Sequence, residues 1–367
     1  MKSKIKTGNK LQVIDKIVLV LNIIGAICLL LSYLAPGTDP RDISFIAILG
    51  FGYHLLVIAN VLAIIYWLFR KRVFALISLI VVIAGAYFFS YNFGFRSSAY
   101  PAQNKPANTI RIMAYNVHAL KGIEHYEGES IKQGVLDLIK SKQPDVINFE
   151  EFVVTVADKG AFTDSLIGLN YKYHYFKPYG IRRADSSGNA IFSKYPLSKF
   201  DSVKSPNLLQ TRGIYADVLV NGKTFRMYCA HLAAVQIKDQ EKSKYLNGGI
   251  NLEKSSFITS KLSSAFIRRS FQVSQIKKNI DDCPYPYVIV GDFNDTPMSF
   301  AVNELGDGLK NAFREKGSGF VNTYYNTFPK LHIDHVLASP QFDVITYEAV
   351  DKKLSDHKPI VVDLELN

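Results

Sequence analysis

Four short segments of this chain deliver side chains that could bind a metal ion or move a proton. In chain order they are MAYNVH (113–118), INFEEF (147–152), GDFND (291–295) and SDHKP (355–359). Each follows or ends an apolar run typical of a β-strand, and each places an Asn, Asp, Glu or His at the end of that run. Oxygen ligands that converge from strand ends can form a pocket for Mg²⁺ or Mn²⁺ next to a phosphate group. The segments therefore predict metal-assisted phosphate chemistry.

The elements that must position these segments follow a mixed α/β pattern from residue 110 onward. Strand-like runs occupy much of this part, and residues 130–143 have the apolar spacing of a helix. The Asn-Gly pair at 221–222 lies between two alternating runs and indicates a β-hairpin. Many strands with few long helices between them favour a layered α/β sandwich of two mainly antiparallel sheets over a doubly wound fold.

The first part of the chain has a different composition. Residues 17–35, 43–69 and 73–93 are long, apolar and free of Asp, Glu, Lys and Arg. Each could cross about 30 Å of hydrocarbon as a helix, so residues 1–94 are predicted to be a three-helix transmembrane region. Three buried helices of a soluble protein are the alternative. The Pro-, Ser- and Ala-containing stretch at 95–109 is expected to link this region to a domain at 110–367.

Basic residues predict the orientation of these spans. Several lysines precede the first span, and Arg70, Lys71 and Arg72 lie between the second and the third. The positive-inside rule therefore places the N-terminus and the 70–72 turn in the cytoplasm. Three crossings of the cell membrane then leave everything after about residue 94 on the non-cytoplasmic side.

The net charge of +11 is divided unevenly between the two parts. Residues 1–99 carry ten Lys or Arg and three Asp or Glu, a net +7, while residues 100–367 carry 33 and 29, a net +4. Much of the basic excess thus belongs to membrane topology. The outer domain is only mildly basic, which weakens any argument from charge for a nucleic-acid substrate.

Residues 233–280 are predicted to form one or two helices with a Lys/Arg-rich face. A solvated helix face is one interpretation, and contact with substrate or lipid headgroups is the other. Arg269 and Gln272 within this segment are expected to serve packing and ion pairing.

The four segments, together with YCAHL (228–232) and HIDHV (332–336), resemble the endonuclease/exonuclease/phosphatase superfamily. Its members include pancreatic deoxyribonuclease, abasic-site endonucleases, neutral sphingomyelinases and inositol polyphosphate phosphatases. The resemblance covers about residues 108–365. It implies a four-layer α/β sandwich and hydrolysis of a phosphate ester with Mg²⁺ or Mn²⁺, by in-line attack of water and without a covalent intermediate.

The resemblance also implies roles for individual residues. The residues expected to bind the metal are Glu151, Asn116 and Asp356. The residues expected to carry catalysis are His231, Asp292, Asn294, His357 and Asp334. In these roles Asp292 orients or deprotonates water, and Asn294 holds a phosphate oxygen. His231 and His357 bind phosphate and transfer protons. The aspartate of HIDHV supports a catalytic histidine, and Asn189 is a candidate for contact with the substrate phosphate.

One position departs from the family pattern. Glu150 stands where the family usually has Gln, so it is open whether Glu150 shares metal binding with Glu151. Four other histidines are expected to be structural, because none has a partner at metal-ligand spacing: His118, His125, His174 and His332. His335, beside the aspartate of HIDHV, is also expected to be structural.

The sequence thus predicts a membrane-anchored, Mg²⁺-dependent phosphoesterase with the lipid bilayer and a phosphate ester as its partners. A nucleic acid, a phospholipid and an inositol or sugar phosphate all fit as substrate. A catalytically silent membrane receptor or scaffold on the same fold is the alternative from another class.

Overall fold

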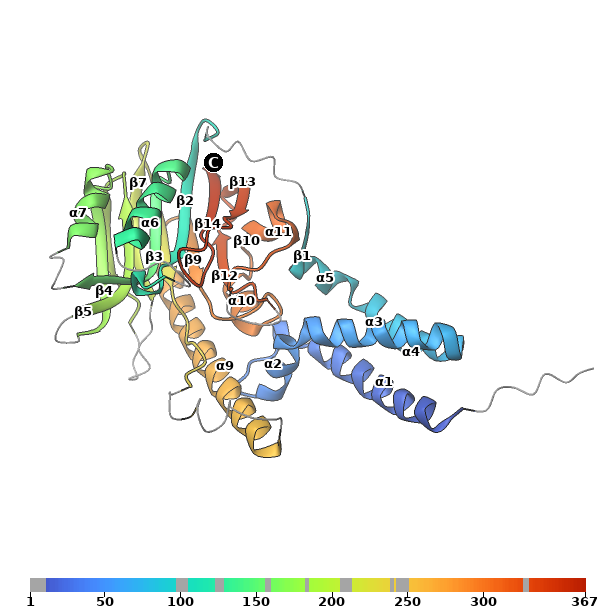
Figure 1. Cartoon of the computed structure of the whole chain (residues 1–367). Helices are drawn as coiled ribbons and strands as arrows, with labels where there is room; N and C mark the ends of the chain where they lie inside the picture. Colours follow the sequence, from blue (N-terminus) through green and yellow to red (C-terminus); the bar gives the residue numbers. More distant parts are fainter. Residues whose placement is uncertain are drawn as a thin grey trace, which may run out of the picture.

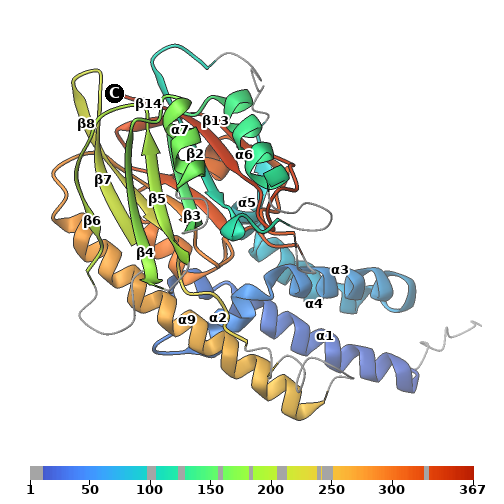
Figure 2. The ribbon, with the colours of Figure 1, turned by 60° about the vertical axis from the view of Figure 1, so that its left-hand side comes forward.

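The computed structural model describes residues 11–96, 105–122, 129–155, 160–181, 185–204, 213–237, 241, 251–325 and 330–367. His125, much of the predicted linker and residues 242–250 lie outside the described residues. After the N-terminal helices, the chain forms two six-stranded sheets that pack face to face (Figures 1 and 2).

The first sheet has the strand order β13-β14-β2-β3-β5-β4. In that order its strands are Phe342–Ala349, Ile360–Leu366, Thr109–Asn116, Val146–Thr155, Asp185–Ser193 and Tyr173–Ile181. The second sheet has the order β10-β12-β9-β8-β7-β6. Its strands are Lys310–Asn311, Asp334–Ala338, Tyr287–Asp292, Lys223–Ala230, Gly213–Val220 and Leu197–Ser202.

Both sheets are mainly antiparallel, as the sequence predicts. The exceptions are the pair β2 and β3 in the first sheet and the pair β8 and β9 in the second. Parallel neighbours end at the same edge of their sheet. The hairpin predicted at 221–222 joins β7 to β8, with positive φ at Asn221 and Gly222 as a type I′ turn requires.

Helices cover the outer face of each sheet and complete four layers. α6 (Glu129–Lys142) and α7 (Ala161–Gly168) cover the first sheet, while α9 (Leu252–Asp281) and α10 (Phe300–Leu305) cover the second. Strand β2 shows why its run is apolar throughout: Ile112 and Ala114 pack between the sheets, whereas Met113 and Tyr115 pack under α6. The predicted four-layer α/β sandwich is confirmed. The shorter helices are η1 (Ala35–Gly37), η2 (His118–Leu120) and α11 (Ala312–Lys316).

The N-terminal region is helical over most of its described length. α1 (Val13–Ser32), α3 (Tyr53–Arg70) and α4 (Arg72–Ala84) pack together, and α5 (Ala86–Asn92) bends away from α4 by 58°. The predicted span 43–69 is two helices, because α2 (Ser44–Phe51) and α3 meet at a break at Gly52. Within the described residues two helices are long and apolar enough to cross a membrane, or three if α4 and α5 form one bent span.

Polar side chains fasten these helices to one another. Arg70 Nη2 on α3 lies 2.9 Å from Asp15 Oδ2 on α1, and the Tyr66 hydroxyl donates to the same carboxylate. Nearer the middle of the bundle, the Ser78 hydroxyl on α4 lies 2.7 Å from Asn60 Oδ1. Interhelical contacts of this kind stabilise packing where the surroundings are apolar.

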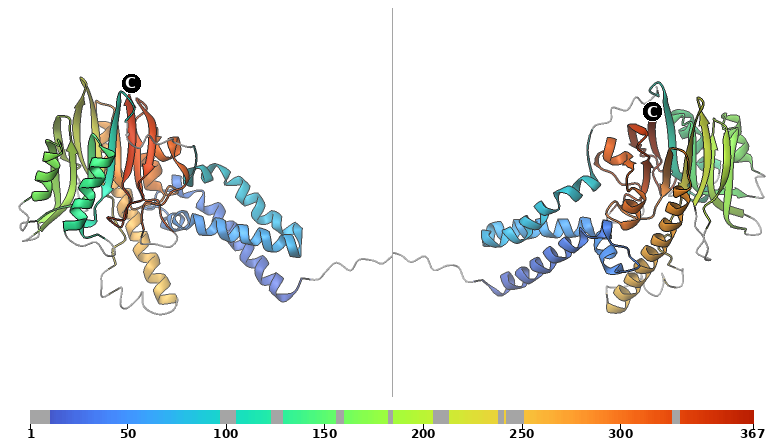
Figure 3. Two further views of the ribbon diagram at one scale, coloured as in Figure 1. Left: turned by 45° about the horizontal axis from the view of Figure 1, so that its top comes forward. Right: turned by 180° about the vertical axis from the view of Figure 1, so that it is seen from behind.

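The N-terminal region also contacts the sandwich directly. β1 (Phe93–Phe95), which follows α5 and ends inside the predicted linker, pairs with β11 (Ser318–Phe320) of the domain. Gly94 allows this pairing, because a Cβ there would lie 2.2 Å from the carbonyl oxygen of Gly317. α2 packs against α9, which runs along the second sheet and extends past it (Figures 1 and 3). The two parts are therefore joined by packing as well as by the chain.

A buried ion pair in the first sheet gives a test of stability. Arg111 Nε lies 2.7 Å from Asp363 Oδ1, and both side chains are buried. Asp363→Ala would leave the guanidinium without its partner and should lower the free energy of unfolding by about 3–5 kcal/mol. Chemical denaturation of the full chain in detergent, followed by circular dichroism, measures this. Asp343→Ala removes an exposed pair with Lys310 and should change little; equal losses in both variants would contradict the prediction.

Candidate active site

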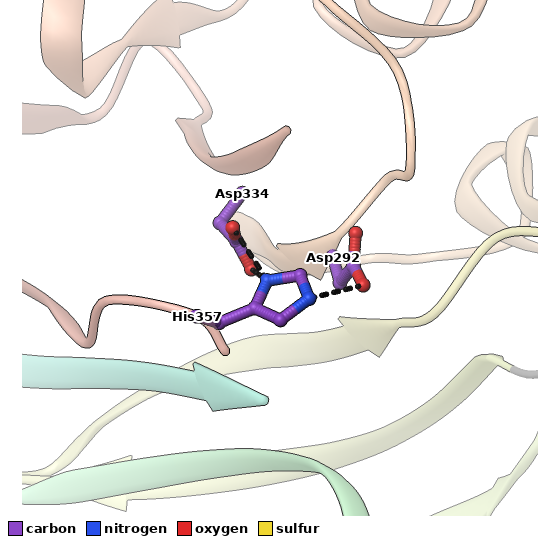
Figure 4. Close-up of side chains that lie close together, drawn as sticks. All are labelled: Asp292, Asp334 and His357. Carbon is purple, nitrogen blue, oxygen red and sulfur yellow. Dashed lines mark hydrogen bonds and ion pairs between the residues drawn. The ribbon is translucent and has the colours of Figure 1, made fainter. Parts of the chain in front are cut away.

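Three side chains from separate parts of the second half of the chain meet at one rim of the sandwich (Figure 4). Asp292 ends β9 and pairs in register with Asp334, which begins the antiparallel strand β12. His357 comes from the loop before β14. Its Nδ1 lies 2.9 and 3.0 Å from the two carboxylate oxygens of Asp334, and its Nε2 lies 3.6 Å from Asp292 Oδ2. The imidazole thus bridges two carboxylates.

Burial and charge set the protonation of this group. Asp292 is 1% exposed and His357 is 5% exposed. Burial opposes a charge on His357, but Asp334 and Asp292 outweigh it and raise the pKa of His357 to about 10. Burial, helped by Asp334, raises the pKa of Asp292 to about 7, although His357 and two hydrogen-bond donors oppose this rise. His357 is therefore a cation near neutral pH.

Asp292 is held by hydrogen bonds from two predicted site residues. Asn116, which ends β2, donates from Nδ2 to Asp292 Oδ2 over 3.1 Å. The backbone N–H of Asn294 donates to Asp292 Oδ1 over 2.8 Å, and the Asn294 amide donates to the carbonyl of Leu232. These bonds fix the carboxylate while leaving it within reach of both histidines.

His231 follows β8 and lies near the same carboxylate oxygen of Asp292 as His357. Its Nε2 lies 3.6 Å from Asp292 Oδ2 and 3.9 Å from Glu151 Oε1. Its Nδ1 lies 2.8 Å from the hydroxyl of Tyr179, which also bonds to Asn189. His231 thus turns Nε2 toward the carboxylates of the rim.

Two less buried carboxylates lie beside this group and could hold a divalent ion. Glu151 Oε2 and Asp356 Oδ2 lie 3.8 and 3.4 Å from the same atom, Nδ1 of His118. The Glu151 side chain is 33% exposed, and the His118 ring between the two carboxylates is 40% exposed. Hard oxygen donors that lie beside one another at a partly exposed part of the rim are of the kind that binds Mg²⁺ or Mn²⁺. Asn116 Oδ1 meanwhile accepts from the backbone N–H of His118.

Glu150 faces the opposite way from Glu151. The register of β3 shifts between Phe149 and Phe152, and Glu151 has a φ of 52°. Glu150 is fully buried between the sheets, where Cys229 Sγ lies 3.2 Å from its Oε1. Burial, together with the nearby carboxylates, raises the pKa of Glu150 well above its usual value. A protonated Glu150 is neutral, like the Gln that the family usually has there.

The ligand atoms of Asp292, Asp334 and His357 lie within 4.8 Å of one another, a spacing at which three side chains could hold a metal ion. An imidazolium has no lone pair for a metal, because both ring nitrogens carry protons. With His357 protonated the three side chains form a hydrogen-bonded chain, and with His357 neutral their carboxylate oxygens and ring nitrogen could hold a divalent ion.

Most of the predicted residues meet at this rim. Asn189 is the exception: it is buried behind Tyr179, and its Nδ2 donates to the carbonyl of Cys229. Arg269 pairs with Asp295 at 3.0 Å and Gln272 accepts from the N–H of Ala233, which agrees with the packing role expected for the helix.

Two residues at the site were not predicted. His118, expected to be structural, lies between the Glu151 and Asp356 carboxylates. Its place in MAYNVH, two residues after Asn116, was a usable signal. Tyr179 reaches the site from β4, and no spacing along the chain connects it with His231. Three other histidines that were expected to be structural make ring contacts elsewhere in the described residues: His174 stacks on Phe192, and His332 stacks on His335.

Comparisons with known proteins show the family and the fold of this chain. The family model described as the endonuclease/exonuclease/phosphatase family matches residues 113–357. A second model, described as a domain of unknown function, matches residues 15–91. No curated protein matches the chain at a significant level.

Solved structures share the fold. An endonuclease/exonuclease/phosphatase from Beutenbergia cavernae is 20% identical, with a TM-score of 0.52, over 71% of this chain and 72% of that chain. The human Nocturnin catalytic domain with bound sulfate is 18% identical, with a TM-score of 0.52, over 72% of this chain and 97% of that one.

The match over residues 113–357 shows the class of protein. The chain belongs to the endonuclease/exonuclease/phosphatase family, whose members are metal-dependent phosphoric ester hydrolases. It is a phosphoesterase of that family.

The hydrogen bond between His357 and Asp334 predicts how the stability of the protein depends on pH. The folded pKa of His357, about 10, exceeds the ordinary value of about 6.5, so its contribution to stability is complete below about pH 6.5 and is lost as the pH rises through about 10. Asp334→Asn should lower this pKa. The stability gap between wild type and variant should then shrink between pH 6.5 and 10. NMR of ¹⁵N-histidine and unfolding across this range measure both effects; an unchanged His357 titration would contradict the assignment.

Proposed function

We propose that this chain is a membrane-anchored phosphoesterase that uses Mg²⁺ or Mn²⁺ to hydrolyse a phosphodiester or phosphomonoester by in-line attack of water. The proposal is supported above all by the contacts that bring Glu151, His231, Asp292 and His357 to one rim. Glu151 lies 3.9 Å from His231, and both His231 and His357 lie 3.6 Å from Asp292. These residues are separated by up to 206 positions along the chain and meet only in the fold.

The carboxylates of Glu151 and Asp356 would hold the ion, and the amide of Asn116 would complete or orient its surroundings. A bound divalent ion would polarise a phosphoryl oxygen and neutralise the charge that develops on it. Oxygen donors with partial exposure suit this task, because the ion must reach both protein and substrate.

The residues of the chain supply the remaining chemistry. Asp292, fixed by Asn116 and the N–H of Asn294, is suited to orient the attacking water and to accept its proton, since its pKa of about 7 matches neutral conditions. The His357 cation is suited to bind a phosphate oxygen, and His231 Nε2 faces the same space. Water adds its oxygen to phosphorus, the ester bond breaks, and the leaving oxygen takes a proton.

The substrate stays open among nucleic acid, phospholipid and inositol or sugar phosphate. Anchoring at a bilayer favours a lipid, because a tethered site meets headgroups at high effective concentration. Hydrolysis of plasmid DNA, sphingomyelin and inositol phosphates by the purified full chain would separate the three classes. The alternative function, a catalytically silent receptor or scaffold, is not favoured by the sequence. Each position that the family pattern requires carries a suitable side chain.

Adjacent glutamates provide the sharpest test of the site. Glu151→Gln should lower Mg²⁺-dependent hydrolysis of bis-p-nitrophenyl phosphate by a factor of about 100 or more, because it removes a charged ligand. Glu150→Gln, a matched control one residue away, should retain activity within a few-fold, because burial raises the pKa of Glu150 and so favours a neutral form that Gln resembles. EDTA should abolish wild-type activity, and added Mg²⁺ or Mn²⁺ should restore it. The reverse pattern, with loss only in Glu150→Gln, would make Glu150 the ligand.

The orientation in the membrane is tested separately. We place the N-terminus in the cytoplasm and the catalytic domain on the non-cytoplasmic side, from the basic residues around the spans. A C-terminal alkaline phosphatase fusion, active only after export, should be active, whereas a C-terminal fluorescent protein that folds only in the cytoplasm should be dark. A bright fluorescent fusion would overturn the orientation and leave the chemistry untouched.

A further inference from the structure

Tyr179 is the centre of a hydrogen-bonded chain that ends at His231. Tyr179 lies on β4, its partner Asn189 lies on β5, and His231 follows β8 of the other sheet. The Tyr179 hydroxyl contacts Asn189 Oδ1 and lies 2.8 Å from His231 Nδ1. The backbone N–H of Glu151 points at the same hydroxyl over 3.5 Å. One phenol therefore connects the predicted metal ligand with a predicted catalytic histidine.

The orientation of the Asn189 amide determines which atom donates in the hydrogen bonds that Tyr179 makes with Asn189 and His231. Asn189 Nδ2 donates to the backbone carbonyl of Cys229 over 3.3 Å, so its Oδ1 must face Tyr179. The reverse orientation of the amide would set two oxygens against each other. Because Asn189 Oδ1 can only accept, the single proton of the Tyr179 hydroxyl goes to Asn189.

The consequence falls on His231. With its proton committed to Asn189, the Tyr179 oxygen has only lone pairs left for its other partners. It can accept from the N–H of Glu151 and from Nδ1 of His231, so Nδ1 must carry a proton. In the neutral ring Nε2 is then a bare acceptor, and this is the atom that faces Asp292 and Glu151.

We propose that Tyr179 is a positioning residue that holds neutral His231 as the Nδ1–H tautomer, so that Nε2 carries no proton and can accept a proton or a hydrogen bond from water or substrate. The catalytic consequence rests on the proposed function, whereas the tautomer itself does not. Without this constraint Nε2–H would be favoured, because it could donate to the Asp292 or Glu151 carboxylate. Asn189 is then the residue that orients Tyr179, and it need not touch substrate.

NMR of ¹⁵N-histidine-labelled full chain in detergent, without metal, tests the tautomer directly. In the wild type the proton of neutral His231 should be on Nδ1. In Tyr179→Phe it should move to Nε2 in a substantial fraction of molecules. Asn189→Leu should have the same effect with Tyr179 still present, because the freed hydroxyl can donate to His231 Nδ1. His231→Gln assigns the resonance, and Tyr173→Phe, on an exposed tyrosine of the same strand, is the matched control and should change nothing.

Kinetics with bis-p-nitrophenyl phosphate and Mg²⁺ give the second measurement. Tyr179→Phe should lower kcat about 10- to 100-fold and change KM less than threefold. Asn189→Leu should likewise lower kcat while leaving KM nearly unchanged. A wild-type His231 with its proton on Nε2, or a Tyr179→Phe variant with unchanged tautomer, would overturn the proposal. A rise in KM with unchanged kcat in Asn189→Leu would instead make Asn189 a substrate contact and would also overturn it. An inactive wild type would refute the proposed function and leave the NMR result standing.

Discussion

The candidate site depends on how the protein stabilises several carboxyl groups at a rim that largely excludes water. Asp292, Asp334 and Glu150 are all almost fully buried, and a buried carboxylate is costly without a cation or donors. The His357 cation lies between the first two, and burial raises the pKa of Glu150, which favours its neutral form. The more exposed Glu151 is the carboxylate that we propose as a metal ligand. Burial thus divides chemically similar residues into different roles.

The sandwich produces this rim through the direction of its strands. Because β2 and β3 are parallel, as are β8 and β9, their C-terminal ends reach the same edge of the packed sheets. Asp334 joins them because β12 runs antiparallel to β9 and begins where β9 ends. The side chains of the candidate site therefore lie at or next to the ends of strands that are packed on both faces. This packing restricts the movement of the side chains.

The N-terminal helices are attached to this sandwich by more than a tether. β1 pairs with β11, α2 packs on α9, and the Ser270 hydroxyl of α9 donates to Asp39 in the loop after α1. Packing of this kind gives the catalytic domain a fixed orientation relative to the helices. For a membrane-anchored enzyme this orientation would decide which molecules at the bilayer surface reach the rim.

The sequence by itself determined the four-layer sandwich, the antiparallel sheets and most residues of the rim, because strand periodicity and the ordered motifs are local signals. The split between Glu150 and Glu151 was not available, since it depends on the irregular register of β3 and on a positive φ at Glu151. The parts played by Tyr179 and His118 were also decided only by the tertiary structure. A hydrogen bond from β4 to the end of β8 leaves no spacing along the chain, because it forms only where two sheets pack face to face.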